Sequence, residues 1–187
     1  YTKLSVQRAS LDAYPASVAK ADLRSLDRNE QLALLINAYN GYTLLLILTA
    51  YPGIESIKDL DKPWEIRAYR VGGHVLSLND IEHGLLRPIY KEPRIHFAVN
   101  CASKGCPPLS NRAYTGADVD AQLTTATQRT LRDPRHAYLK NNRLYLNKIL
   151  HWYGGDFVDE SYNQSAESIP KWVVKYANED VVELITR

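Results

Sequence analysis

The chain has 187 residues, a length that fits one domain with a sizeable core, so residues 1–187 are treated as a single domain. Its net charge of +2, with 24% charged residues, argues against a protein that holds nucleic acid by bulk electrostatics, and no nucleic-acid partner is expected. The longest apolar run, Leu44–Tyr51, is shorter than the roughly 20 residues of a membrane span, so none is expected. Methionine is absent and the chain begins at Tyr1, which indicates a processed product.

The first part of the chain is predicted to be helical. Two amphipathic stretches, 4–13 and 16–23, precede Leu26–Leu48, which is apolar almost all round and is therefore predicted to be a buried central helix. Asp27 can cap its start, and Glu30 follows three residues later in the pattern of a capping box. The Tyr-Pro-Gly sequence that follows is expected to end the helix.

The middle of the chain predicts a hairpin and then a short helix. Trp64–Leu78 contains two alternating runs joined by Gly72–Gly73, which is typical of a tight hairpin. Leu78–Arg87 is predicted to be a helix that Asn79 caps, with Glu82 as the glutamate of a capping box, and that Pro88 closes.

The remaining elements complete the fold class. Arg94–Cys101 predicts a strand from its branched and aromatic content, and Thr115–Asp133 predicts an amphipathic helix. Ala137–Leu150 predicts a second hairpin around Asn141–Asn142, and residues 169–185 predict helix. This order indicates an α+β fold, with a buried central helix and surrounding helices packed on a small, mainly antiparallel sheet.

Four motifs occur in an order that matches a known family: INAYNGYTLL (36–45), LSLNDIEHGLLR (76–87), RIHFAVNCASKGCPPL (94–109) and KILHWYGGDF (148–157). Over about residues 26–177 the chain resembles the bacterial branch of the domain-of-unknown-function 547 family. The resemblance implies an exported protein, in the periplasm or attached to its membranes. It also implies a more distant likeness to papain-like or transglutaminase-like thiol folds, although no tryptophan directly follows either cysteine.

The two cysteines allow two readings. In an oxidising compartment Cys101 and Cys106 could close a small disulfide loop. Alternatively, Cys101 is a reactive thiol whose thiolate is favoured by a nearby cation, for which Lys104, His96 and His83 are candidates. In a regular strand His96 and Cys101 would point to opposite faces, so His83 is preferred to His96 as the base in a catalytic set.

Several polar residues are candidates for a ligand-binding cleft. His83 and Arg87 are four residues apart on the predicted helix, so they project to the same side and suit a carboxylate or a phosphate. Asn40 lies in an otherwise apolar helix, where a buried amide needs partners. The full candidate binding set is Asn40, His83, Arg87, His96, Asn100 and Lys104.

Two further carboxylates, Asp80 and Asp156, are candidates for a site. Asp80 and His83 have a spacing that could ligate a metal, but no second ligand pair is spaced to join them, so no metal site is expected. Asp156 is interpreted as a turn residue rather than as a remote orienting carboxylate. Tyr153 is interpreted as a packing residue. No cofactor is expected.

Three functions remain open. The first is a small-ligand-binding or sensory module, with a cleft for an anionic, thiol-bearing or peptide-like ligand and with a signalling protein as a further partner. The second is a cysteine-dependent hydrolase or acyltransferase with Cys101 as nucleophile. The third is a disulfide-stapled module that binds other proteins.

Overall fold

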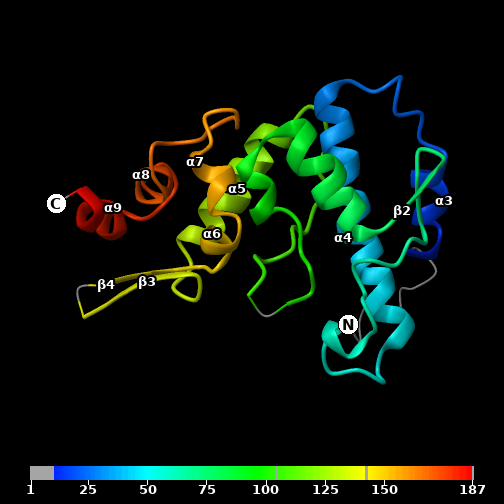
Figure 1. Ribbon diagram of the computed structural model, residues 1–187, viewed down its shortest axis with the longest axis horizontal. Coiled ribbons are helices and arrows are strands. Elements are labelled where there is room, and N and C mark those ends of the chain that lie inside the picture. The colour runs from blue at the N-terminus through cyan, green and yellow to red at the C-terminus, as the bar shows by residue number, and fades with distance from the viewer. Residues whose placement is uncertain (1–10, 104, 142, 187) are drawn as a thin grey trace.

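The computed structural model describes residues 11–103, 105–141 and 143–186 and has the predicted α+β fold. Helix α3 (Tyr14–Ala19) lies near the start of the described residues, and the long helix α4 (Arg28–Ala50) follows it in the chain (Figure 1). The predicted stretch 16–23 is therefore helical only as far as Ala19. Residues 1–10, which hold most of the predicted helix 4–13, lie outside the described residues.

Helix α4 begins as the sequence predicts. The Asp27 carboxylate accepts hydrogen bonds from the backbone N–H groups of Asn29 (2.8 Å) and Glu30 (2.9 Å). The Glu30 carboxylate accepts one from the N–H of Asp27 (2.8 Å), which completes the capping box. By length and composition α4 could also cross a bilayer, but most of its apolar stretch is buried inside the protein. It acts here as the central helix of the core.

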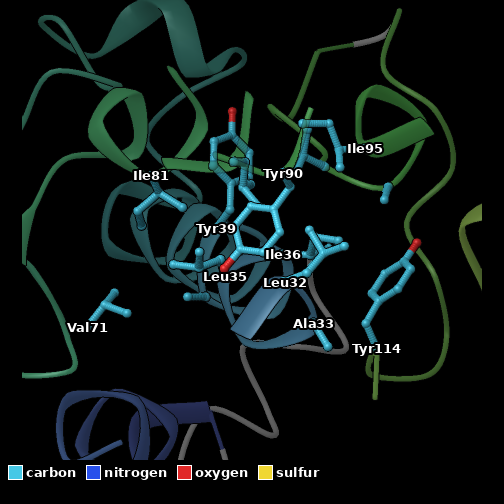
Figure 2. Close-up of a cluster of buried hydrophobic side chains, with 14 of the residues drawn as sticks. Leu32, Ala33, Leu35, Ile36, Tyr39, Val71, Ile81, Tyr90, Ile95 and Tyr114 are labelled. Carbon is cyan, nitrogen blue, oxygen red and sulfur yellow. The ribbon is translucent and has the colours of Figure 1, made fainter. Parts of the chain in front are cut away.

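The main core forms where α4 meets the middle of the chain. Leu32, Leu35 and Tyr39 of α4 pack near Ile81 and the ring of Tyr90 (Figure 2). Each fully buried side chain of this kind contributes about 1.5–3 kcal/mol. A second core cluster joins the later helices and includes Phe97, Leu131, Ile149, Phe157, Trp172 and Val173. These two clusters hold the elements that carry the site.

The first predicted hairpin is confirmed, with shorter strands than the sequence suggests. Strand β1 (Tyr69–Val71) pairs antiparallel with β2 (His74–Leu76). Gly72 and Gly73 join them with φ angles of 55° and 83°, which only glycine adopts at little cost.

The second predicted hairpin is also confirmed. Strand β3 (Ala137–Lys140) pairs antiparallel with β4 (Arg143–Leu146), and the hairpin projects from the helices at one end of the molecule (Figure 1). Asn141, the first turn residue, has a φ of 50°, and Asn142 lies outside the described residues. The two hairpins form separate two-stranded sheets.

The predicted strand at Arg94–Cys101 is wrong. Residues Pro93–Phe97 form the 3₁₀ helix η3 instead. Glu92 caps this turn by accepting a hydrogen bond from the N–H of Arg94 (3.1 Å), and Pro93 suits the first helical position. The Arg94 guanidinium also binds the carboxylates of Glu92 and Asp120, so the turn is tied to helix α5 (Val119–Leu131). These local caps outweigh the strand preference of the branched residues.

The predicted helix after the first hairpin is present and helical winding begins at Leu78 as predicted, but its predicted end at Arg87 and its predicted Asn79 cap are wrong. Helix η2 (Asp80–Tyr90) has π-helical winding and continues through Pro88. Its start is fixed by Ser77 and Asp80: the Asp80 carboxylate accepts from the Ser77 N–H, and the Ser77 hydroxyl accepts from the Asp80 N–H, both at 2.9 Å. Asn79 makes no side-chain cap. Because Leu86 and Tyr90 are buried, packing holds the last turn despite the proline.

The C-terminal part is a series of short helices. These are α6 (Ile149–Trp152), α7 (Gly154–Val158), α8 (Ile169–Val174) and α9 (Glu179–Thr186). The 3₁₀ turn η1 (Ile57–Asp59) lies earlier in the chain, between α4 and β1. The helix predicted over 115–133 is confirmed as α5, with bounds that are tighter at both ends. Helix α7 carries Asp156, which becomes central to the site.

Candidate functional site

A buried carboxylate joins two elements that are far apart in the sequence. Asp156 of α7 accepts two hydrogen bonds from the Arg87 guanidinium of η2, with Nε to Oδ2 at 2.7 Å and Nη2 to Oδ1 at 2.9 Å. This two-point geometry is the strong form of an arginine–carboxylate pair. The predicted turn role of Asp156 is therefore incomplete, because its side chain is buried and holds η2 against α7.

His96 is the second partner of Asp156. Its Nε2 lies 2.8 Å from Asp156 Oδ2, and its ring stacks on Tyr153 with centroids 4.0 Å apart. An ionised carboxylate only accepts hydrogen bonds, so Nε2 carries the proton. In the neutral ring Nδ1 is then an acceptor with a free lone pair. His96 is only 2% exposed, and its Nδ1 has no hydrogen-bond partner among the described residues.

The charges in this array favour a neutral His96 beside an ionised Asp156. Burial lowers the pKa of His96, and the hydrogen bond to Asp156 opposes this only in part. Burial alone would raise the pKa of Asp156, but the hydrogen bonds from His96 and Arg87 and their charge lower it overall. The bonds to Asp156 also raise the pKa of Arg87. At neutral pH the histidine is therefore a neutral base held by a carboxylate.

A second buried carboxylate, Glu82, faces two tyrosines. The phenol groups of Tyr39 and Tyr153 lie close to Glu82, and burial followed by the Glu82 charge raises the pKa of both phenols. The predicted capping role of Glu82 is wrong, because Ser77 and Asp80 form that cap. The Glu82 side chain instead lies in the interior next to His96.

The two cysteines are bonded to each other. Cys101 and Cys106 form a disulfide, which is the first of the two states that the sequence left open. Two asparagines fix the loop that carries it. Asn40 of α4 donates to the Ala98 carbonyl (2.9 Å) and accepts from the Asn100 N–H (2.8 Å).

Asn100 in turn closes the loop from within. Its side chain donates to the Pro107 carbonyl and accepts from the Ala102 N–H, both at 2.8 Å. The amide groups of Asn40 and Asn100 therefore have partners in the protein backbone. They are part of the frame of the site.

A small cavity of about 40 Å³ connects these groups. It is lined by Tyr39, Glu82, His96, Val99, Cys101, Gly105, Cys106, Ile149, Trp152 and Tyr153. This space exceeds that of one or two waters but is far below the 300–1,000 Å³ of a small-molecule site. It can admit a few atoms of a larger molecule next to the sulfurs and His96.

The structure brings together some of the predicted site residues but not all of them. His96, Cys101 and Cys106 line the same cavity, so the expectation that His96 and Cys101 lie on opposite faces is wrong: His96 belongs to the helical turn η3, and Cys101 follows in irregular backbone. His83 and Arg87 are neighbours, with Nδ1 and Nη1 3.3 Å apart, but His83 is exposed and does not line the cavity. Lys104 lies outside the described residues.

The sequence interpretation named Asp156, Tyr153 and Glu82 but gave them the roles of a turn residue, a packing residue and a cap, so it did not place them in the site. Asp156 is 60 residues from His96, so no local spacing could connect them. Among the described residues, no group of three or more His, Cys, Asp or Glu side chains is placed to hold a metal ion.

Comparison with known proteins places this chain in a family. The family model described as "Protein of unknown function, DUF547" matches residues 23–131, more than half of the chain. The chain belongs to the DUF547 family. Neither the comparison with curated proteins nor the comparison with solved structures gives a match.

The DUF547 match covers only part of the site. His96, Arg87, Glu82 and both cysteines fall within the matched residues, whereas Asp156 lies beyond them. The matched segment also ends well before residue 177, where the resemblance noted in the sequence ends. In this member of the family, the carboxylate that orients His96 therefore comes from the C-terminal part of the chain.

Proposed function

We propose that this protein is a thiol-dependent acyl-transfer enzyme, a hydrolase or acyltransferase, whose thiols are stored as the Cys101–Cys106 disulfide. One observation carries the proposal. The Nε2 of His96 is bound to Asp156, while its unpartnered Nδ1 belongs to a side chain that lines the same cavity as both sulfurs. A cysteine next to a base that a third group orients is the arrangement of an activated nucleophile.

Reduction opens the site. A dithiol reductant supplies two electrons and two protons, so that the S–S bond becomes two thiols and the reductant becomes a disulfide. Cys101 is the nucleophile in this proposal, because both of its neighbours are anchored through the Asn100 side chain and Asn40. Cys106 is the resolving thiol, and it accepts a hydrogen bond from the Cys101 N–H at 3.2 Å.

The acyl-transfer steps then balance. Neutral His96 takes the Cys101 proton at Nδ1, and the thiolate attacks the carbonyl carbon of an ester or amide. When the tetrahedral intermediate collapses, the bond to the leaving group breaks and His96 returns the proton to that group. Water or another acceptor then attacks the thioester, giving its proton to His96, and the thiol is regenerated.

The same features bear on the ligand-binding alternative. Arg87 makes two hydrogen bonds to Asp156, and the side-chain amides of Asn40 and Asn100 are bonded to the backbone. These groups therefore have fewer free hydrogen-bond donors for an anionic ligand than their sequence positions suggest. Thiol chemistry uses the groups that do face the cavity, which is why we prefer it.

Export and the more distant relationships belong to the same proposal. A disulfide at the centre of the site suits an oxidising compartment, which supports the periplasmic location expected for bacterial members of the family. The pairing of His96 with Asp156 beside a cysteine also supports the likeness to papain-like thiol folds. A reducing protein of the same compartment is then the natural partner.

Acylation of the reduced protein tests this function. After reduction and removal of the reductant, the protein is mixed with 4-nitrophenyl acetate, and nitrophenolate release and the intact mass are followed. We expect one acetyl group on Cys101, loss of this label in Cys101→Ser, and its retention in Cys106→Ser. His96→Gln should slow acylation by about 100-fold or more. Equal acylation of His96→Gln and the wild type would refute the proposal, as would no acylation at all.

A further inference from the structure

A larger groove of about 400 Å³ adjoins the thiol cavity, and its walls include Gly105 and Trp152, which also line the cavity. The groove is completed by Arg135, His136, Tyr138, Tyr145, Leu146, Asn147 and Lys148. Its volume falls within the range of small-ligand sites, whereas the thiol cavity does not. A molecule seated in the groove would therefore have only a few atoms inside the thiol cavity.

One amide ties the groove to the cysteine loop. The Asn147 side-chain NH₂ donates to the Gly105 carbonyl (3.0 Å) and to His136 Nδ1 (2.7 Å). Asn147 is buried, and its carbonyl oxygen accepts from the Ile149 N–H (2.9 Å). The β3–β4 hairpin, the start of α6 and the disulfide loop therefore form one frame. A ligand bound to the hairpin would therefore have a fixed position relative to the disulfide.

Exposed aromatic side chains line the groove. Tyr138 and Tyr145 are directly opposed on β3 and β4, and their rings stack with centroids 5.0 Å apart. Trp152 is 59% exposed, an unusual state for the largest apolar side chain. Such rings provide contact area at a low cost in conformational entropy.

The charged side chains that the described residues contribute to the groove are basic. Arg135 and Lys148 line it, and none of the described residues in the lining is a carboxylate. Arg135 is paired with Asp133 just outside the lining. Lys148 is exposed and, within the described part of the chain, makes no ion pair. The open cation is therefore Lys148, next to Trp152 along the α6 turn.

We propose that this groove binds an acidic peptide as the acyl donor of the reaction, an inference that rests on the proposed function. Its carboxylates would meet Lys148, its apolar groups would contact Tyr145 and Trp152, and a peptide carbonyl would enter the thiol cavity. An extended peptide fits because both edges of the two-stranded β3–β4 sheet present backbone groups to which a further strand can bond. A nucleic acid is disfavoured, because it needs a stripe of unpaired cations.

Peptide binding to the oxidised protein tests the groove without any thiol chemistry. The probe is acetyl-Ala-Glu-Tyr-Glu-Ala-amide, compared by calorimetry at low salt with its glutamine counterpart, in which both Glu are Gln. We expect the acidic peptide to bind and the glutamine peptide to bind at least about tenfold more weakly. Lys148→Glu should weaken the acidic peptide by about tenfold or more. Lys58→Glu, an exposed lysine of η1 with the same charge change, should leave binding within about twofold.

Each other result overturns the inference. Absence of binding, equal binding of the two peptides, or equal weakening by Lys58→Glu and Lys148→Glu would show that the groove does not select acidic peptides. Acylation of the wild-type protein by 4-nitrophenyl acetate is measured separately, because that small ester carries no acidic segment and does not need the groove. Failure of the groove therefore leaves the acylation result intact. Failure of the proposed function appears instead as lost acylation with peptide binding retained.

Discussion

Replacing Asp156 by asparagine perturbs the site with almost no change in shape. Asp156 Oδ2 accepts from both Arg87 Nε and His96 Nε2, and Oδ1 accepts from Arg87 Nη2. An amide has only one oxygen. If that oxygen replaces Oδ2, the amide NH₂ faces Arg87, and if it replaces Oδ1, the NH₂ faces both Arg87 Nε and His96. In either orientation a donor meets a donor, or His96 must change its tautomer.

The expected cost follows from these contacts. A hydrogen bond to a charged group is worth about 1.5–3 kcal/mol, and breaking a buried ion pair costs about 3–5 kcal/mol. The Arg87 side chain is 28% exposed, so water recovers part of the loss. We expect Asp156→Asn to lower the free energy of unfolding by about 3 kcal/mol, a large part of the 5–15 kcal/mol of a typical domain.

The same change should reduce the reactivity of the reduced cysteines. If His96 turns its protonated nitrogen towards the cavity, it can no longer accept the Cys101 proton, and acylation should fall by about 100-fold or more. Urea unfolding followed by tryptophan fluorescence gives the stability, and nitrophenolate release gives the reactivity. Asp159→Asn, an exposed carboxylate of the same turn, is the control and should stay within about 0.5 kcal/mol. A stability loss below about 1 kcal/mol with unchanged acylation would refute the reasoning.

Three further outcomes follow. The folded protein disfavours protonation of His96, so the free energy of unfolding should fall as the pH drops below the ordinary histidine pKa of about 6.5. In urea titrations between about pH 5 and 7.5, His96→Gln should make the free energy of unfolding depend less on pH. Asn40→Ala leaves two backbone groups unpaired and should cost about 2–4 kcal/mol in the same assay, whereas Asn111→Ala, an exposed asparagine, should cost almost nothing. Reduction of the Cys101–Cys106 loop should cost about 2 kcal/mol, and the double serine variant should match the reduced protein.

The sequence predicts best where the signal is local. The capping box of α4, its apolar length and the two hairpin turns are set by residues within a few positions of each other, and all are confirmed. The segment Arg94–Cys101 was misread because branched and aromatic residues favour strands only as a tendency. There, the Glu92 cap and Pro93 fix a helical turn, and the buried Arg94 network holds it to α5.

The site was only partly predictable, for a related reason. The cysteine loop, His96 and the His83–Arg87 pair are recognisable from residue type and spacing. Their connections are not, because Asp156 reaches His96 across 60 residues and Arg87 across 69. The strand assignment also placed His96 and Cys101 on opposite faces, and this error in the local backbone is the reason why the sequence-based hypothesis prefers His83 to His96 as a base.

The state of His96 links stability to chemistry. A buried acceptor without a donor costs about 1–3 kcal/mol, and His96 Nδ1 is a buried acceptor with no donor among the described protein residues. Asp156 maintains it, because the carboxylate fixes the proton on Nε2 and leaves the lone pair on the other nitrogen. Reduction creates two S–H groups, and the lining of the cavity holds both sulfurs and His96. A thiol that donates to Nδ1 would satisfy this acceptor, and in the proposed reaction this is the hydrogen bond along which the proton moves.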